Sequence, residues 1–600
     1  MVANRGEIAR RVIRTARQLG WRTVALFTEP DRGAQHVREA DAAIEVPSHL
    51  DVAAVVAAAR EAGAGFVHPG YGFLSERAEF ARALEAAGIV LVGPSAEVMD
   101  AMGRKDKARE IALAAGVPVV PSYSLTDDPA TMSFPVLVKA AAGGGGKGMR
   151  VVRNAHELDE AKGAAAREAA KAFGDDTLLI EKYVESGRHI EVQVMGDHHG
   201  AVRHFFERDC STQRRHQKVL EEAPAPTIGA AQREAITQAA VDLAAEVGYR
   251  NAGTVEFLLD NATGEFYFLE MNTRLQVEHP VTEMVTRVRG EAVDLVALQL
   301  RLARGEPIGI EQHDITLEGH AIEARVYAED SFNGFLPQAG RAGLVEWPRG
   351  TADQRIDEAL ESGQVVSTGF DPMLGKVICR GATRDEARQR LSEALGDTVI
   401  AGLSTNTGFL KALVDADEFA EASIDTAWLD THEVPAPDPA PARALAARAL
   451  TPPVGRGPFA ADGFRLGGPP AQLRVQLDEP VTVRRDEPLA VTGTVLPADD
   501  HVEVILEGQR HVFALPDPFG EHGSAESDGT LLAPMPGIVL DVRVAEGDRV
   551  SEGDILGVME AMKMELSLKA PYHGTVVTVG AKQGAQVALG TVLFEVSADE

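Results

Sequence analysis

The chain has 600 residues, of which 45% are hydrophobic and 25% are charged, proportions that are typical of globular proteins and exclude a disordered or fibrous chain. Its 90 acidic and 59 basic residues leave a formal net charge of −31, which disfavours nucleic acid and anionic membranes as partners. Two cysteines, Cys210 and Cys379, are too few for a disulfide framework or a cysteine-rich metal site. No apolar run could span a membrane and no apolar signal core follows Met1, so we predict a soluble, cytoplasmic, multidomain protein.

The first ninety or so residues alternate short apolar strands with amphipathic helices. The expected strands are Val24–Thr28, Ala43–Val46, Phe66–His68 and Val90–Val92, and the expected helices are Glu7–Leu19, Val52–Ala62 and Ala78–Ala87. This alternation predicts a parallel sheet covered by helices. Because a helix begins close to Arg5, the opening strand is short, and we expect the natural chain to begin a few residues before Met1.

The pattern changes after residue 94. Residues 95–305 are rich in glycine and in strand-forming runs, whereas residues 306–430 mix strands with helices. We therefore expect two further domains at 95–305 and 306–430.

Proline stands at every second position between Val434 and Pro441. Such a density predicts an extended, semi-rigid linker, which we place at 431–458. Strand-like runs follow and predict a small β region at 459–514, with a second linker at 515–530.

The C-terminal region contains an internal repeat. Ala533, Pro534, Gly537, Val539, Gly547, Val550 and Gly553 recur 37 positions later as Ala570, Pro571, Gly574, Val576, Gly584, Val587 and Gly590. The repeat predicts two similar β units, related by a pseudo-two-fold axis, that close into a small sandwich at 531–597. Chance similarity in a tail rich in glycine and valine is the alternative.

Lys563 stands between Met562 and Met564, after a predicted strand, and the pseudo-symmetry places it on a protruding turn. Methionines adapt to a partner surface, although an ordinary solvated lysine is the alternative. The segment Glu560–Met564 resembles the attachment motif of biotin carrier domains, which implies that Lys563 carries biotin. Lipoyl domains share the fold, but their lysine usually has acidic or alanine neighbours.

A run of four glycines, Gly143–Gly146, lies between Lys139 and Lys147. Such a run lets backbone N–H groups approach a polyphosphate while lysines balance its charge, although a flexible loop is an equal alternative in isolation. The run lacks the Gly-Lys-Ser/Thr ending of a P-loop. Lys105 and Lys139 favour nucleotide binding.

The segment Gly253–Asn272 predicts a hairpin centred on Thr263, in which Glu256 lies opposite Glu270. Opposed carboxylates destabilise a hairpin unless a cation lies between them. Asn272 lies on the same face, two positions beyond Glu270, so the hairpin predicts a divalent metal site beside a nucleotide. The alternative is that both glutamates face solvent.

Two further polar clusters lie near this hairpin in the sequence. Glu270–His279 contains a cation, Arg274, and a candidate base, Glu278, and Glu207–Lys218 is too polar for a core. Either cluster could also be a solvated run of charges.

Several motifs together resemble the biotin-dependent carboxylases, in particular their biotin carboxylase part. The matching segments are Ala3–Ile8, His68–Phe73, Gln213–Lys218, Glu270–His279, His320–Arg325 and Asp371–Met373. The resemblance covers about residues 1–430 and 531–597. It implies an α/β multidomain chain with a Rossmann-like N-terminal domain (1–94), an ATP-grasp domain (95–305), an α+β C-terminal carboxylase domain (306–430), a small β region and an all-β biotinyl sandwich.

The resemblance also implies a role for each matched residue. ATP would be bound by Lys105, Lys139, Gly145, Gly146, Glu181, His189 and His216. Mg²⁺ or Mn²⁺ would be held by Glu256, Glu270 and Asn272, and bicarbonate by Lys218, Arg274, Gln276 and Val277. Glu278 would be the base, with Lys218 and Arg274 also catalytic, and Arg325 would steady the biotin enolate. Glu323 and Arg325 share one face of a strand, which suits a paired guanidinium.

The implied function is the ATP- and bicarbonate-dependent carboxylation of biotin on Lys563, as the α subunit of an acyl-CoA carboxylase. Its implied partners are a separate carboxyltransferase β subunit, a biotin–protein ligase and further copies of the chain. Two alternatives remain, a pyruvate- or urea-type carboxylase and a carrier scaffold with an inactive ATP-grasp region. Segments near residues 46–50 and 120–134 look shortened, residues 286–292 look like an insertion, and 459–514 weakly resembles a subunit-docking region.

Overall fold

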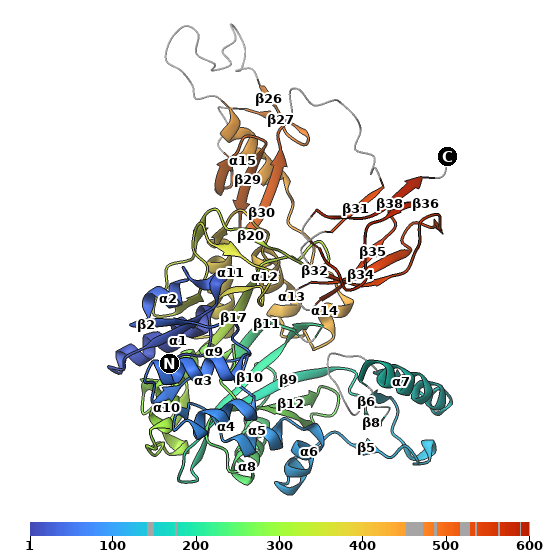
Figure 1. Ribbon diagram of the computed structural model, residues 1–600. Helices are drawn as coiled ribbons and strands as arrows, with labels where there is room; N and C mark the ends of the chain where they lie inside the picture. The colour runs from blue at the N-terminus through green and yellow to red at the C-terminus, as the bar shows by residue number, and fades with distance from the viewer. Residues whose placement is uncertain are drawn as a thin grey trace.

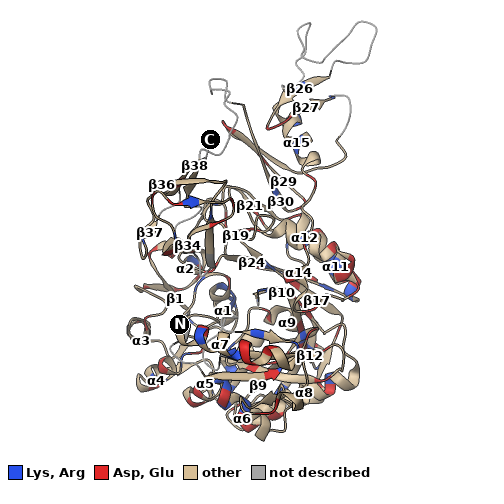
Figure 2. Cartoon of the chain, turned by 90° about the vertical axis from the view of Figure 1, so that its right-hand side faces the viewer, with Lys and Arg blue, Asp and Glu red and all other residues tan. Residues whose placement is uncertain are grey.

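The computed structural model (Figure 1) describes residues 1–140, 149–173, 177–215, 217–451, 472–484, 489–516, 529–533, 537–561, 564–587 and 590–598. In Figure 1 and in the perpendicular view of Figure 2, helix α15 (Ala440–Leu450) lies at the opposite end of the molecule from helix α8 (Ala230–Glu246). One large sheet between these ends is the frame of the candidate site.

The N-terminal region contains the parallel pairs that its sequence predicts. The strands are β1 (Val24–Phe27) with β2 (Ala42–Glu45) and β3 (Phe66–Val67) with β4 (Val90–Leu91), and the main helices are α1 (Gly6–Gln18), α3 (Val52–Glu61) and α4 (Ala78–Ala86). Val2 forms parallel bridges to Ala25 and His68, which join the two pairs. Phe80 and Leu84 of α4 are fully buried against Leu26, so the sheet packs on its helices as the alternating pattern requires.

The central and C-terminal regions share one eight-stranded antiparallel sheet. In spatial order its strands are β13 (Phe266–Asn272), β12 (Asn251–Asp260), β9 (Gly187–Gly196), β10 (Val202–Arg214), β11 (Gln217–Ala223), β17 (His320–Tyr327), β24 (Met373–Gly381) and β22 (Gln354–Glu358). Helices α8, α11 (Arg384–Gly396) and α12 (Thr407–Asp415) cover its apolar face. Because side chains alternate along a strand, the polar residues project from the other face, where α9 (His279–Val285) lies.

A smaller lobe projects beside this sheet, at the lower right of Figure 1. Its four strands are β5 (Ser122–Tyr123), β8 (Leu178–Lys182), β6 (Val136–Ala140) and β7 (Arg150–Val152). Helix α7 (Leu158–Phe173) buries Leu158 and Ala165 against them. The glycine-rich segment that follows β6, with Gly145 and Gly146, lies outside the described residues.

Residues 440–450, which lie within the predicted linker 431–458, form helix α15 instead, so the linker prediction is wrong for this part. Pro439 and Pro441 occupy the cap and first turn of this helix, where a missing N–H breaks no helical hydrogen bond, and the alanines that follow favour helix. Ala446 and Ala447 are fully buried against the small β region. The strands of that region are β26 (Leu473–Gln476), β27 (Pro480–Val483), β28 (Thr494–Pro497), β29 (His501–Leu506) and β30 (Gln509–Ala514).

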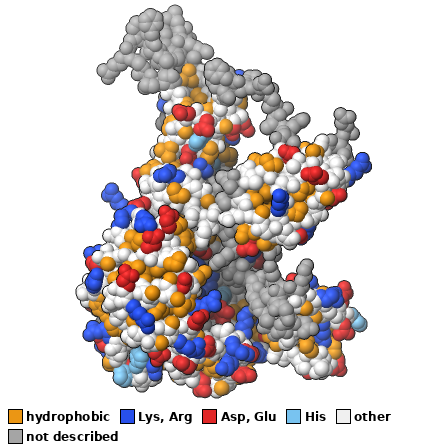
Figure 3. Space-filling model, in the orientation of Figure 1, with side chains coloured by type: hydrophobic (Ala, Val, Ile, Leu, Met, Phe, Trp, Pro, Cys, Tyr) orange, Lys and Arg blue, Asp and Glu red, His pale blue; other side chains and the backbone are white. Residues whose placement is uncertain are grey.

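The internal repeat forms a sandwich, as predicted. The corresponding strands are β32 (Gly537–Val542) and β36 (Gly574–Val579), β33 (Arg549–Val550) and β37 (Gln586–Val587), and β34 (Ile555–Ala561) and β38 (Val592–Ala598), each pair 37 positions apart. Strand β33 pairs with β36, and β37 pairs with β32, so each half contributes a strand to the other half's sheet. Figure 3 shows this sandwich at the right, projecting from the side of the molecule.

Residues 286–292 form a short hairpin of β14 (Thr286–Val288) and β15 (Glu291–Ala292), as the extra length of this segment allows. Strand β14 also pairs with β16 (Ile315–Leu317), so the hairpin provides two of the three strands of a small sheet.

Candidate active site

A row of charged side chains crosses the polar face of the large sheet. Glu270 pairs with Glu256, Glu256 with Glu191, and Glu191 with Arg208, on four neighbouring strands from β13 to β10. The predicted register of the hairpin, with Glu256 opposite Glu270, is therefore confirmed. Three opposed carboxylates repel one another, so this face requires cations.

Lys218 supplies one of these cations. Its Nζ atom, almost buried on β11, lies 2.6 Å from Glu191, 2.8 Å from Glu278 and 3.2 Å from Glu256. Burial opposes the charge of the ammonium, but the three carboxylates outweigh this effect and raise the pKa of Lys218 well above its usual value. Lys218 is therefore a fixed positive charge at the centre of the site.

Arg208, the last residue of the row, supplies a second cation. Its fully buried guanidinium donates to Glu191 at 2.6 Å and to Gln276 at 2.9 Å. The second hydrogen bond fixes the amide of Gln276, whose NH₂ group donates to Glu256 at 2.8 Å.

Glu278 lies where α9 begins, with its carboxylate between two cations. Lys218 donates to Oε1 at 2.8 Å, and Arg325 donates to Oε2 at 3.1 Å. Burial disfavours the anion, but Lys218 and Arg325, with help from Arg208, lower the pKa of Glu278 well below its usual value. Glu278 is thus ionised at neutral pH and able to accept a proton.

Arg325 does not form its ion pairs with Glu323, the residue that the strand pattern indicates. Glu323 and Arg325 do share a face of β17, but the guanidinium forms its ion pairs with Glu221 at 2.5 Å and with Glu278 at 3.1 Å. Glu221 lies directly opposite Glu323, on the neighbouring strand β11. Within the described part of the chain, neither carboxylate oxygen of Glu323 has a hydrogen-bond partner. Burial raises the pKa of Glu323 well above its usual value, and the ion-pair partners of Arg325 are Glu221 and Glu278 instead.

The segment between β13 and α9 brings its polar groups to the same place. Asn272 donates to Glu256 at 2.7 Å, and Arg274 donates to Asn272 at 3.1 Å and to Glu76 at 3.0 Å. The carbonyl oxygen of Val277 accepts a hydrogen bond from Lys376 at 2.7 Å. Lys218, Arg274, Gln276, Val277 and Glu278, which the sequence places in two separate motifs, thus belong to one site.

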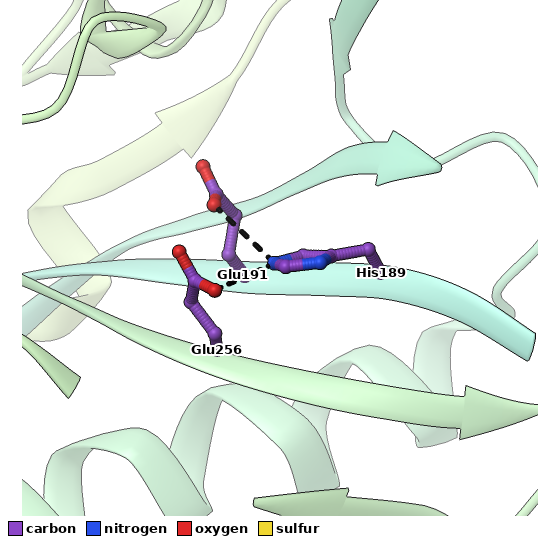
Figure 4. A group of neighbouring side chains, drawn as sticks. All are labelled: His189, Glu191 and Glu256. Atoms are coloured by element: carbon purple, nitrogen blue, oxygen red, sulfur yellow. Dashed lines mark ion pairs between the residues drawn. The ribbon is translucent and has the colours of Figure 1, made fainter. Parts of the chain in front are cut away.

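Figure 4 shows a further contact within this site. The Nε2 atom of His189, two residues before Glu191 on β9, lies 2.8 Å from Glu256 and 3.9 Å from Glu191. Burial disfavours the charged imidazole, but the Glu256 carboxylate outweighs it and raises the pKa of His189. The ligand atoms of the three side chains lie within 4.8 Å of one another, close enough to hold an ion, but an imidazole nitrogen suits Mg²⁺ less well than oxygen ligands do.

Glu256, Glu270 and Asn272 fit a divalent metal better. Their carboxylate and amide oxygens are the ligands that a hard cation such as Mg²⁺ prefers. Glu256 and Asn272 also hydrogen-bond to other residues of the site, whereas among the described residues Glu270 forms no ion pair. Desolvation and the facing Glu256 raise the pKa of Glu270, and a cation bound between the two carboxylates would oppose this shift.

We expect Glu270→Gln to raise the Mg²⁺ concentration needed for half-maximal ATP cleavage, because one carboxylate rather than two remains to hold the ion. Titration of activity with Mg²⁺ measures this change. Glu265→Gln is the matched control, since Glu265 lies at the exposed turn of the same hairpin. If the two variants had equal Mg²⁺ dependence, Glu270 would not be a metal ligand.

The predicted nucleotide-binding residues are only partly described. Lys139 on β6 forms a 2.5 Å ion pair with Glu181 on β8. Lys105 is exposed at the start of α6 (Lys105–Ala114), close enough to Glu270 to favour its charged form. Gly145, Gly146, His216 and Lys563 lie outside the described residues.

Sequence reasoning missed Glu191, Arg208 and Glu221. The alternation of His189, Glu191 and Gln193 along one strand is a usable signal, because three polar residues at period two mark one polar face. Arg208 and Glu221 carry no comparable signal, since each lies in a run of mixed charges.

Lys563 lies between two described strands of the sandwich. Strand β34 ends at Ala561, and β35 (Met564–Lys569) begins at Met564, which pairs with Ala561. The pairing thus brings Ala561 and Met564, which stand on either side of Met562 and Lys563 in the sequence, together at the ends of β34 and β35.

Four family models match the chain. Their descriptions are "Biotin carboxylase, N-terminal domain" (residues 1–99), "Carbamoyl-phosphate synthase L chain, ATP binding domain" (104–311), "Biotin carboxylase C-terminal domain" (323–431) and "Biotin-requiring enzyme" (529–596).

Similar proteins match over nearly the whole length. The mitochondrial methylcrotonoyl-CoA carboxylase subunit alpha of Oryza sativa is 39% identical over 99% of this chain and 94% of its own, and the propionyl-CoA carboxylase alpha chain of Ruegeria pomeroyi is 38% identical over 99% of both. Among solved structures, the biotin carboxylase domain of the Hydrogenobacter thermophilus 2-oxoglutarate carboxylase, in complex with MgADP, ADP and bicarbonate, is 42% identical. It covers 72% of this chain and 96% of its own with a TM-score of 0.66.

Proposed function

Because the chain belongs to the biotin-dependent carboxylases and joins a biotin carboxylase to a biotin carrier domain, we propose that it is the α subunit of an acyl-CoA carboxylase. In this function the ATP-grasp region uses ATP and bicarbonate to carboxylate biotin on Lys563. The observation that carries the proposal is the position of Glu278, an ionised carboxylate held between Lys218 and Arg325 beside the Glu256–Glu270 pair.

Glu278 acts as the base. It accepts the proton of bicarbonate, which then attacks the γ-phosphate of ATP to give carboxyphosphate and ADP. Lys218, which donates to Glu278, and Arg274, which donates to Asn272, would offset the negative charge of bicarbonate and of the phosphates. Bound Mg²⁺ would offset the charge that develops on the phosphates, held by Glu256, Glu270 and Asn272.

The cations that bind Glu278 also weaken it as a base, because a carboxylate with a strongly lowered pKa attracts protons poorly. Bicarbonate must therefore take over part of the hydrogen bonding from Lys218 or Arg325 before the proton moves. The same exchange frees a guanidinium N–H group of Arg325 for the substrates, while its ion pair with Glu221 remains.

Biotin would supply the ureido nitrogen for CO₂, which carboxyphosphate releases together with phosphate, and the phosphate would take the proton of that nitrogen. Arg325 provides a fixed positive charge at the position where negative charge develops during this transfer. Its ion pairs with Glu221 and Glu278 orient the guanidinium from two sides.

The test is bicarbonate-dependent release of ADP by the purified chain with free biotin and MgATP. We expect ADP release to require both bicarbonate and Mg²⁺. ATP binding without turnover would instead favour a carrier scaffold with an inactive ATP-grasp region.

The chain needs a carboxyltransferase β subunit for acyl-CoA carboxylation, and that subunit determines the acyl group. We expect it to co-purify with the biotinylated chain on an avidin matrix and to carboxylate an acyl-CoA with it. Recovery of a pyruvate-type transferase alone would overturn the acyl-CoA assignment.

Further parts of the proposal concern assembly and location. A biotin–protein ligase modifies Lys563, the chain forms a homo-oligomer, and it is located in the cytoplasm. No helix in the described ranges is both long and apolar enough to cross a membrane. We propose the domain division predicted above, with the first linker ending before α15. Cell fractionation with avidin detection tests the location.

A further inference from the structure

Lys376 is a fully buried lysine outside the set of residues that the family resemblance assigns to the site. It lies on β24 directly opposite Arg325 of β17, on the polar face of the sheet. Its Nζ atom donates to the carbonyl oxygen of Val277 at 2.7 Å and forms an ion pair with Glu7 at 3.1 Å. A buried ammonium needs such partners, since burial without them would remove its charge.

Three parts of the chain meet at this ammonium. Lys376 belongs to the C-terminal carboxylase region, and Val277 to the segment that the proposed function assigns to bicarbonate. Glu7 lies on α1 of the N-terminal region, where it also accepts a hydrogen bond from Tyr71. The positions of the three regions are thus coupled through Lys376.

The ammonium remains charged in this environment. Burial opposes its charge, but Glu7, Glu323 and Asp357 outweigh burial and raise the pKa of Lys376. Arg355 is the nearby cation that opposes them. The hydrogen bond to Val277 is therefore a charge-assisted one, stronger than a bond between neutral groups.

The peptide that Lys376 holds is the one that joins Val277 to Glu278. A peptide unit is planar, so fixing its carbonyl oxygen also fixes the amide nitrogen and the Cα atoms on both sides. The contact therefore sets the backbone of a bicarbonate-binding residue and of the base together.

We propose that Lys376 is a positioning residue for bicarbonate, which holds the Val277–Glu278 peptide in place and is itself held by Glu7 of the N-terminal region. The proposal rests on the proposed function, because it takes Val277 and Glu278 as the bicarbonate-binding segment. It gives α1 a role in bicarbonate affinity, although α1 contributes no residue to the predicted site.

The first test is Lys376→Met, which keeps the length of the side chain and removes the donor. We expect the KM for bicarbonate to rise about tenfold, the factor that corresponds to the loss of one charge-assisted hydrogen bond. The KM for ATP should stay within twofold, since Lys376 has no contact with the predicted nucleotide-binding residues that the structure describes. Lys411→Met is the matched control, because Lys411 of α12 pairs with Asp415 away from the site.

Glu7→Gln is a second variant, which tests the coupling even if Lys376→Met does not fold. Glutamine keeps the shape of Glu7 but not its charge, so Lys376 loses its ion pair and retains Val277. We expect a smaller rise in the KM for bicarbonate, again without a change in the KM for ATP. An unchanged KM for bicarbonate in the folded variants, or an equal rise in both KM values, would overturn the proposal. Absence of bicarbonate-dependent ADP release in the unmodified chain would instead contradict the proposed function.

Discussion

Glu278→Gln is expected to lower bicarbonate-dependent ATP cleavage about 10²–10⁴-fold, the usual effect of removing a general base. Glutamine keeps the shape of the side chain, but its amide cannot accept the proton of bicarbonate. ATP binding should persist, because the predicted nucleotide-binding residues lie on other elements. Steady-state ADP release and equilibrium binding of ATP measure the two effects separately.

The variant should still fold, because both cations that contact Glu278 have other partners. Lys218 retains Glu191 and Glu256, and Arg325 retains Glu221. Glu318→Gln serves as the control, since Glu318 lies at the surface, where it pairs with Arg287 and Arg380. Turnover close to that of the unmodified chain would remove Glu278 from the mechanism.

Lys563→Arg is expected to abolish avidin binding and acyl-CoA carboxylation while leaving the carboxylation of free biotin intact. Arginine keeps the positive charge but lacks the primary amine to which a ligase attaches biotin. The ATP-dependent reaction takes place in a separate domain, so free biotin should still be carboxylated. Avidin blotting and the two carboxylation assays test these three outcomes.

A neighbouring lysine provides the matched control. Lys569 is exposed at the other end of strand β35, so Lys569→Arg should keep both biotin attachment and activity. Avidin binding by the Lys563→Arg variant would place biotin on another residue. Loss of free-biotin carboxylation as well would show that the carrier and the carboxylase domains are not independent.

Local sequence was sufficient to predict the Gly253–Asn272 hairpin and the C-terminal sandwich. The turn at Asn261–Gly264 and the alternation along both strands predict the observed pairing of Glu256 with Glu270. They do not predict the irregularity after Glu256, which shifts the pairs nearer the turn by one residue. The 37-residue repeat likewise predicted strands that correspond pair by pair. The hairpin depends on contacts between residues close in sequence. The sandwich could be predicted because the same pattern of residues occurs twice.

The partners of Lys218 could not be predicted in this way. Glu191, Glu256 and Glu278 lie 27, 38 and 60 positions away from it along the chain. Nothing in the Glu207–Lys218 run distinguishes a buried cation from a solvated one, because that difference depends on which strands become neighbours. The structure excludes the solvated alternative for Lys218 and for Arg208.

Helix α15 is a second feature that depends on contacts between residues distant in sequence. The prolines between Val434 and Pro441 correctly exclude a helix interior there, but they cannot show that the alanines after them are covered by β29 and β30. The sequence by itself determined which charged residues are present, the family resemblance and the periodicity of most elements. Only the tertiary structure decided which charges are buried together, and hence that the pKa of Glu278 is lowered, that of Glu323 is raised and Lys376 holds Val277, because a buried group's charge is set by partners distant in sequence.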